Sequence, residues 1–228
     1  MTIDLNCDMG ELADTRREAA LMEYITSANI ACGGHAGDDE TMERTARLAI
    51  ARGVNIGAHP GYPDRENFGR VAMPMGAAAI AATVTEQIER LDAVTRRLGA
   101  RIVHVKPHGA LYNVAVRDSA VARAIGEGVA AWSRGVTLFG LAGSPMLEVW
   151  RRMGLAVAGE GFADRRYEPD GTLRSRQFPD ALITDPAAAA AQAVQFARAG
   201  IARTICVHGD TPGAVAILKA CSEALQSE

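Results

Sequence analysis

The sequence predicts an α/β fold in which parallel strands close into a barrel. Seven short apolar segments have the composition of buried parallel strands, and they begin near residues 3, 27, 54, 102, 136, 155 and 203. Amphipathic helical patterns lie between most of them, so strand and helix alternate about seven times. Titratable residues follow nearly every strand. An open sheet concentrates such residues at one switch point, so this distribution favours a closed barrel with one shared mouth.

The segments between the strands justify the predicted helices. The clearest helix covers 77–98, where an apolar side chain recurs every three or four residues. Asp38 or Asp39 and Asp185 are expected to start helices, and Gly53 to stop one. The alternation breaks at about 160–180, where we expect an irregular lid or hairpin segment. The whole chain, 1–228, is expected to form one barrel domain.

Composition narrows the class of protein. With 228 residues, 48% of them hydrophobic, the chain can bury one substantial core. A net charge of −3 provides no basic patch for nucleic acid or an anionic membrane. The sequence contains neither a readable signal peptide nor an apolar run of about 18 residues, so a cytoplasmic location is expected. Four scattered cysteines form no C-x-x-C pair and are expected to be small buried hydrophobes.

The first two strands end in polar residues. Asp4, Asn6 and Asp8 alternate along the first strand and therefore point to the same side, into the barrel. Two carboxylates and an amide are costly to bury without a ligand, an ion or a catalytic duty. Asn29 and His35 follow the second strand in the same way.

The third and fourth strands deliver further histidines. His59 ends the third strand, and Arg70 in the loop behind it could bind a carboxylate or pair with an aspartate. The run from His104 through Lys106 to His108 is the densest candidate site. An inward Lys106 could stabilise an oxyanion or neutralise phosphate charge. The alternative is that Lys106 pairs with a carboxylate of the first strand, Asp4 or Asp8.

The last two strands complete the ring of titratable residues. Glu160 ends the sixth strand, and Asp164-Arg165 follows it. His208 and Asp210 follow the seventh strand, where Asp210 or Thr211 could also cap the last helix. The sequence contains no G-x-x-x-x-G-K-[ST] loop and no G-x-S-x-G elbow. The pattern predicts acid/base hydrolysis, with a metal or a phosphorylated intermediate as options.

Seven ordered motifs resemble the LamB/YcsF family, whose members are the A subunits of bacterial ATP-dependent 5-oxoprolinase. The resemblance runs from residue 3 to about residue 220. The motifs read Asn6-Cys-Asp-Met-Gly-Glu11, Asn29-Ile-Ala-Cys-Gly-Gly-His35, Gly57-Ala-His-Pro-Gly-Tyr-Pro-Asp64, Phe68-Gly-Arg70, His104-Val-Lys-Pro-His-Gly-Ala-Leu-Tyr-Asn113, Glu160-Gly-Phe-Ala-Asp-Arg165 and Val207-His-Gly-Asp-Thr-Pro212. The chain departs from the family pattern in its short connection around residues 199–203.

The resemblance implies a distorted (β/α)7 TIM-like barrel of the glycoside hydrolase/deacetylase type. It also implies hydrolysis of 5-oxo-L-proline to L-glutamate, with ATP as co-substrate (accompanied by Mg2+) and subunits B and C as partners. No nucleic-acid or membrane partner is expected, and self-association is compatible with the sequence.

Candidate roles can be assigned on this basis. The proposed catalytic residues are Asp8, His35, His59, Lys106, His108, Glu160, His208 and Asp210. Asp8 or Glu160 would be the base, and the proposed substrate-binding residues are Asn6, Asn29, Arg70 and Arg165.

Two rival functions remain open. One is a metal-dependent deacetylase-type amide hydrolase with Asp8, His35 and His59 as ligands. The other is a non-catalytic subunit that binds the lactam.

Overall fold

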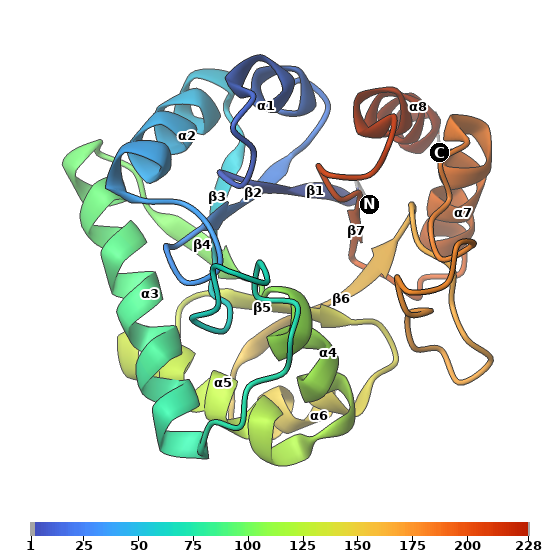
Figure 1. The fold of residues 1–228 in the computed structure, drawn as a ribbon. Helices are drawn as coiled ribbons and strands as arrows, with labels where there is room; N and C mark the ends of the chain where they lie inside the picture. Colours follow the sequence, from blue (N-terminus) through green and yellow to red (C-terminus); the bar gives the residue numbers. More distant parts are fainter. Residues whose placement is uncertain (1–2, 228) are drawn as a thin grey trace.

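Seven parallel strands form a closed barrel in the computed structural model, which describes residues 3–227 (Figure 1). The strands are β1 (Asp4–Met9), β2 (Ser27–Ala31), β3 (Asn55–His59), β4 (Ile102–Val105), β5 (Thr137–Leu141), β6 (Ala156–Phe162) and β7 (Thr204–Cys206). Each begins within about one residue of the predicted start, and each pairs with its neighbour in chain order. β7 pairs with β1 through Thr204 opposite Asp4 and Cys206 opposite Asn6, which closes the barrel.

An outer ring of helices covers the strands (Figure 1). The helices are α1 (Thr15–Leu21), α2 (Asp39–Arg52), α3 (Ala77–Arg97), α4 (Gly109–Arg117), α5 (Ser119–Trp132), α6 (Pro145–Arg152), α7 (Pro186–Arg198) and α8 (Ala214–Gln226). The apolar stripe of α3, including Ile80, Val84 and Leu91, is buried as predicted. Among the described residues, no helix has the length and apolar character needed to cross a membrane.

Two of the predicted helix starts are confirmed and one is wrong. The carboxylates of Asp38 and Asp185 accept hydrogen bonds from the first turns of α2 and α7. Neither Asp210 nor Thr211 caps α8, whose N-cap is Gly213. Their side chains have other partners: Asp210 accepts from two arginines, and Thr211 donates to Asp164.

The irregular segment follows β6 and lies beside the barrel mouth. Glu160 still belongs to the strand, so the segment starts at residue 163, slightly later than predicted. Tyr167 and Leu173 form an antiparallel bridge, and Arg165 pairs similarly with Leu182. The predicted small hairpin is therefore present. All four cysteines are buried and free, as expected.

One strand glycine makes room for a site residue. A Cβ atom on Gly57 of β3 would lie 1.9 Å from Nε2 of His104 on β4. Only a residue without a side chain can therefore occupy this position while His104 points into the barrel.

Candidate active site

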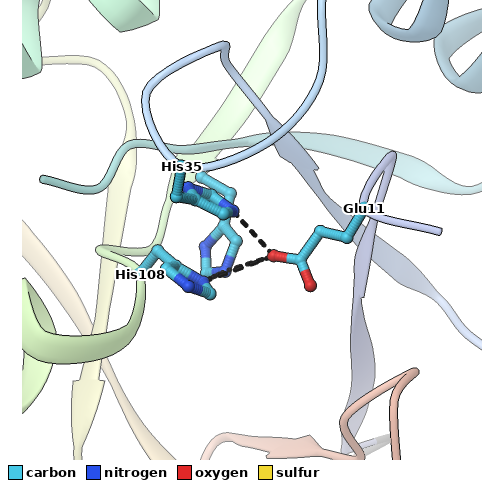
Figure 2. Close-up of side chains that lie close together, drawn as sticks. Glu11, His35 and His108 are labelled. Atoms are coloured by element: carbon cyan, nitrogen blue, oxygen red, sulfur yellow. Dashed lines mark hydrogen bonds and ion pairs between the residues drawn. The ribbon is translucent and has the colours of Figure 1, made fainter. Parts of the chain in front are cut away.

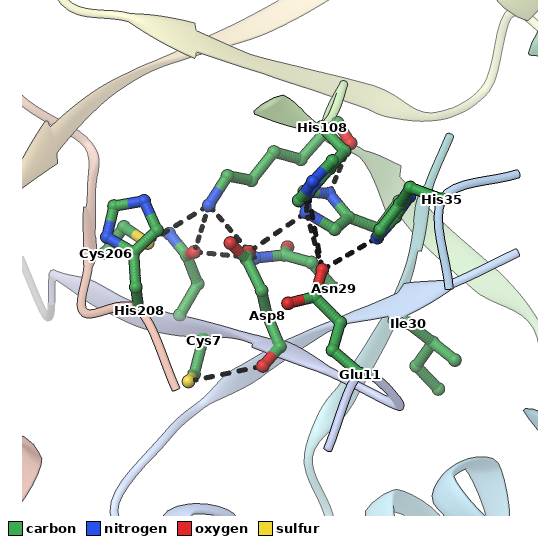
Figure 3. Close-up of polar contacts among 12 residues, drawn as sticks. Cys7, Asp8, Glu11, Asn29, Ile30, His35, His108, Cys206 and His208 are labelled. Atoms are coloured by element: carbon green, nitrogen blue, oxygen red, sulfur yellow. Dashed lines mark hydrogen bonds and ion pairs between the residues drawn. The ribbon is translucent and has the colours of Figure 1, made fainter. Parts of the chain in front are cut away.

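Lys106 is the centre of a buried group of opposite charges at the mouth of the barrel. Its ammonium lies 2.8 Å from Oδ1 of Asp8 and 3.0 Å from Oε1 of Glu160. It also donates to Oδ1 of Asn6 at 3.3 Å and to Sγ of Cys206 at 3.0 Å. Figure 3 shows Asp8 between Cys206 and His208 on one side and His35 and His108 on the other. We call Asn6, Asp8, Lys106, Glu160 and Cys206 the lysine group. Its single ammonium faces two carboxylates, so Lys106 points inward and pairs with Asp8, as the alternative interpretation of the sequence expected. Stabilisation of an oxyanion by Lys106 stays a prediction.

Amide side chains support the lysine group. Asn29 donates to Oδ1 of Asp8 at 2.9 Å and to Asn6 at 2.7 Å. Asn6 in turn donates to Glu160 at 3.1 Å. His104 lies beside Oδ1 of Asn29, with its Nε2 at 2.8 Å, and its ring stacks on Phe139. These residues are buried and fully engaged with one another, so they hold Asp8 and Glu160 in place.

A second group gathers three histidines around one carboxylate. Oε1 of Glu11 lies 2.8 Å from Nε2 of His35 and 3.3 Å from Nδ1 of His108 (Figure 2). Nε2 of His59 lies 3.7 Å from the same oxygen and 2.9 Å from Nδ1 of His108. The His35 and His108 rings stack with centroids 3.5 Å apart. We call Glu11, His35, His59 and His108 the histidine group.

The pKa values of the titratable side chains are shifted for different reasons in the lysine group and in the histidine group. Burial opposes the charge on Asp8, but His59 and Lys106 outweigh it and hold the pKa of Asp8 well below its usual range. Burial likewise opposes the charge on Lys106, yet the carboxylates raise its pKa well above normal. In the histidine group burial lowers the pKa values of His35 and His108 and raises that of Glu11. Burial also opposes the charge on His59, but Asp8 outweighs it and raises the pKa of His59. Asp8 is therefore ionised and Lys106 protonated.

His208 forms a separate pair with Asp164 at the β7 side of the mouth. Its Nδ1 lies 3.0 Å from Oδ2 of Asp164, which also accepts from the His208 backbone amide. Burial would raise the pKa of Asp164, but His208 lowers it below its usual value. An ionised carboxylate behind the ring fixes its orientation and tautomer, and this arrangement suits proton transfer.

A cavity of about 940 Å³ opens above these groups. Asp8, His59, Lys106, His108 and His208 line its inner part. The irregular segment after β6 lines another side and contributes several cations, and the loop after β3 contributes Arg70. The guanidinium groups on the wall are those of Arg70, Arg117, Arg165, Arg174 and Arg176. This charge distribution suits an anionic ligand.

Comparison with known proteins assigns the chain to a family. The family model described as LamB/YcsF matches residues 3–228. The chain belongs to the LamB/YcsF family. The A subunit of 5-oxoprolinase from Chloroflexus aggregans is 48% identical, covering 100% of this chain and 96% of the relative. Its counterpart from Methylococcus capsulatus is also 48% identical, over 96% of this chain and 90% of its own length.

Solved structures confirm the barrel expected for a LamB/YcsF protein. A lactam utilization protein from Thermus thermophilus superposes with a TM-score of 0.91 at 38% identity, covering 100% of this chain and 97% of that chain. A peptidoglycan N-acetylglucosamine deacetylase domain from Eubacterium rectale has a TM-score of 0.54 at 10% identity, covering 99% and 84%. The second likeness shows a shared fold only.

The structure brings most of the predicted site residues together, but not all of them reach the cavity. Asn6, Asn29, His35 and Glu160 are buried and do not line it. Asn29 donates to both Asn6 and Asp8, so these amides hold Asp8 in place, and their predicted role in binding substrate stays a prediction. Arg70 and Asp210 pair with each other at the rim.

The predicted metal trio of Asp8, His35 and His59 does not form a compact ligand set. Oδ1 of Asp8 is held by Lys106 and Asn29, and His35 points to Glu11 instead. Among the described residues, the compact sets are Glu11 with His35, His59 and His108, and Asp8 with Cys206 and His208. Asp8 still lies 3.4 Å from Nε2 of His59, but the residues that form a compact set with His35 and His59 are Glu11 and His108.

Sequence reasoning missed Arg176 and Cys206 as members of the site, and it named Glu11 and Asp164 without assigning a role to either. Glu11 follows the first strand beyond Gly10, whose φ of 73° turns the chain. Side chains alternate between the two faces of a strand, but this pattern stops at such a turn. The direction of the Glu11 side chain was therefore not predictable from its position in the sequence. A carboxylate just beyond a strand end was nevertheless a usable signal, because His35 occupies the same kind of position.

Proposed function

We propose that this chain is the subunit of an ATP-dependent 5-oxoprolinase that carries the site for opening the lactam ring of 5-oxo-L-proline. The observation that carries the proposal is Lys106, a buried ammonium 2.8 Å from Asp8 and 3.0 Å from Glu160 at the floor of an arginine-lined cavity. The naming of full-length relatives as the A subunit of 5-oxoprolinase supports it. The structural relative named as a lactam utilization protein adds to this support.

The chemistry explains the need for ATP. Amide resonance keeps the lactam carbonyl weakly electrophilic, and transfer of the γ-phosphoryl group of ATP to its oxygen removes that resonance and releases ADP. Water then adds to the activated carbon and loses a proton to a base. The ring C–N bond breaks as its nitrogen takes up a proton, leaving an acyl phosphate of glutamate. A second water releases phosphate, so one ATP and two waters yield glutamate, ADP and phosphate.

The lysine group supplies the electrostatics for this reaction. Lys106 lines the cavity and is permanently charged, so it stabilises negative charge on the oxygen of the reacting carbon. Asp8 also lines the cavity and is ionised, whereas Glu160 lies deeper, against Asn6 and Lys106. We therefore assign the role of base to Asp8. His208, held by Asp164, is placed to protonate the leaving nitrogen.

Arg165 is the residue we assign to the substrate carboxylate. It lines the cavity and is 5% exposed, and its Nη2 donates to the backbone oxygen of Arg174. Its Nε has no hydrogen-bond partner in the described structure. A buried guanidinium nitrogen without an acceptor is costly, and a carboxylate would satisfy it. Arg70, by contrast, already pairs with Asp210.

Subunits B and C are expected to supply the nucleotide site, because this chain contains no recognisable phosphate loop. ATP as co-substrate and four free buried cysteines both agree with a reducing cytoplasm.

The test is reconstitution. The purified chain alone should release no ADP, whereas the chain with subunits B and C should form glutamate and ADP in equal amounts when 5-oxoproline is added. ADP release by the isolated chain that depends on 5-oxoproline would contradict the division of labour. Full turnover by B and C without this chain would show that the lactam site lies elsewhere.

A further inference from the structure

We propose that Glu11, His59 and His108 form a binding site for one divalent transition-metal ion of the zinc class. The site lies at the same barrel mouth as the lysine group but does not depend on the oxoprolinase proposal. Metal binding is measured without lactam, ATP or partner subunits, so the two proposals can fail separately.

Backbone carbonyls fix which ring nitrogens carry hydrogen in two of the histidines. Nδ1 of His59 lies 2.7 Å from the carbonyl oxygen of Lys106, and Nε2 of His108 lies 2.9 Å from that of Phe68. A carbonyl oxygen can only accept, so both of these nitrogens donate. In the neutral rings, Nε2 of His59 and Nδ1 of His108 therefore carry lone pairs. A hydrogen bond from the far nitrogen to a carbonyl is the usual support for a metal-ligating histidine.

The two lone pairs face each other. Nε2 of His59 and Nδ1 of His108 are 2.9 Å apart, and the rings are nearly perpendicular, with an interplanar angle of 88°. Oε1 of Glu11 lies 3.3 Å from the His108 nitrogen and 3.7 Å from the His59 nitrogen. Three electron-pair donors this close together repel one another unless a cation lies between them. That cation must be either a proton or a metal ion.

The three distances match the size of a metal ion. A point equidistant from the three ligand atoms lies about 1.9 Å from each of them, close to the ~2.0–2.1 Å of zinc–nitrogen and zinc–oxygen bonds. An ion slightly out of their plane would therefore reach all three without rearrangement. Two imidazoles and one carboxylate with open positions are a ligand set suited to zinc and similar ions, rather than to Mg2+.

His35 is placed as a positioning residue rather than as a ligand. Its ring is stacked on that of His108, with centroids 3.5 Å apart and planes within 3°. An ion lies near the plane of each imidazole that binds it, and one ion cannot lie in two parallel planes. Nε2 of His35 instead donates to Glu11 at 2.8 Å, which orients the carboxylate and leaves Nδ1 without a partner.

The backbone is strained where it supports this site. Phe68, whose carbonyl accepts from His108, has φ of 56°, a left-handed conformation that a bulky residue rarely adopts. Such a conformation persists only where the surrounding structure imposes it. The conformation of Phe68 therefore supports a fixed orientation of the His108 ring at this site.

The other compact ligand set, Asp8 with Cys206 and His208, is a weaker candidate. The ammonium of Lys106 lies 2.8 Å from Oδ1 of Asp8 and 3.0 Å from Sγ of Cys206. A fixed positive charge between two ligands repels a metal ion, and burial holds the pKa of the Cys206 thiol well above its usual value.

The experiment is calorimetric titration of the chelator-treated full chain with Zn2+, together with the visible spectrum of the Co2+-loaded chain. We expect one Zn2+ per chain, no competition from excess Mg2+, and Co2+ absorption bands typical of nitrogen and oxygen ligands. Absence of Zn2+ binding by the unmodified chain would overturn the proposal, since a shared proton would then be the only cation between the ligands.

Substitutions distinguish ligands from supporting residues. Glu11→Gln and His108→Gln should each raise the Kd for Zn2+ by more than about 100-fold, and His35→Gln by roughly 10–100-fold, as expected for a supporting residue. Cys206→Ser and His104→Gln are the matched controls and should leave the Kd unchanged. Circular dichroism identifies any variant that fails to fold, and the other ligand substitution then carries the test. Unchanged affinity in the folded ligand variants, or loss of binding in Cys206→Ser, would contradict the assignment.

Discussion

The lysine group and the histidine group lie side by side at one barrel mouth, yet their charges are balanced in different ways. In the lysine group a built-in ammonium contacts one oxygen of each of two carboxylates, at 2.8 and 3.0 Å. In the histidine group one carboxylate and two imidazole lone pairs converge on one another instead. The comparison sets a permanent electrostatic site beside the site at which we propose that a metal ion binds.

The largest expected effect comes from removing the lysine. Lys106→Ala should lower the turnover of the reconstituted complex by about 10²–10³-fold, because an electrostatic donor to the developing charge is lost. It should also lower the free energy of unfolding by about 3–5 kcal/mol, since two buried carboxylates lose their partner. Turnover assays and urea unfolding measure both effects.

The other lysine of the chain is the matched control. Lys219 lies on α8, exposed and 3.9 Å from Glu223, so Lys219→Ala should change the unfolding free energy by less than about 0.5 kcal/mol. If the Lys106→Ala variant keeps most of its turnover, the lysine group has a structural role and not a catalytic one.

Neutralising one carboxylate in each group tests the comparison directly. Glu160→Gln removes a partner of a fixed cation and should cost about 1.5–3 kcal/mol of stability. Glu11→Gln keeps an acceptor for His35 and relieves repulsion from the lone pairs, so it should cost under about 1 kcal/mol in chelator. Urea unfolding measures the free energy of unfolding of both variants. Equal losses would mean that the charges of the two groups are balanced in the same way.

A smaller effect is expected at the cavity wall. Arg165→Gln should raise the KM for 5-oxoproline about 10–100-fold with a lesser change in kcat, because the substrate carboxylate loses charged hydrogen bonds. Arg47→Gln, on the exposed face of α2, is the control and should leave KM unchanged. A fall in kcat at constant KM would move Arg165 from substrate binding to another role.

The smallest effect concerns pH. Burial lowers the pKa of His104 to about 4, and it also lowers those of His35 and His108. A histidine with a depressed pKa binds fewer protons when folded, so stability should fall as pH drops below about 6.5. His59 has a raised pKa because of Asp8 and should contribute in the opposite sense. Asp8, whose pKa is lowered, loses its contribution only below about pH 4.

Unfolding free energies at pH 7.5 and 5.5 should therefore differ through the histidines and not through the lysine group. His104→Gln should reduce that difference by roughly 1 kcal/mol, since one pKa unit corresponds to about 1.4 kcal/mol. A pH dependence in this window that persists unchanged in His104→Gln would contradict the assigned protonation state.

Much of the fold was predictable because it rests on local patterns. Buried parallel strands are continuous apolar runs, so all seven strand starts could be placed from composition. The inward direction of Lys106 was predictable because Lys106 lies two positions after His104, and such side chains point to the same face of a strand. The cap of α8 was mispredicted because Asp210 and Thr211 have the right chemistry for a cap but are engaged by distant residues, Arg176 and Asp164.

The sequence by itself determined that polar and titratable residues end the strands, because alternation and strand termination are properties of adjacent residues. Only the tertiary structure decided how they pair. Closure of the barrel brings Lys106 to Glu160 and Cys206, and the positive φ of Gly10 separates Asp8 from Glu11. Two carboxylates three positions apart thus serve different groups. Such partners are set by three-dimensional distance and by the competition for each buried charge, which no local pattern in the sequence contains.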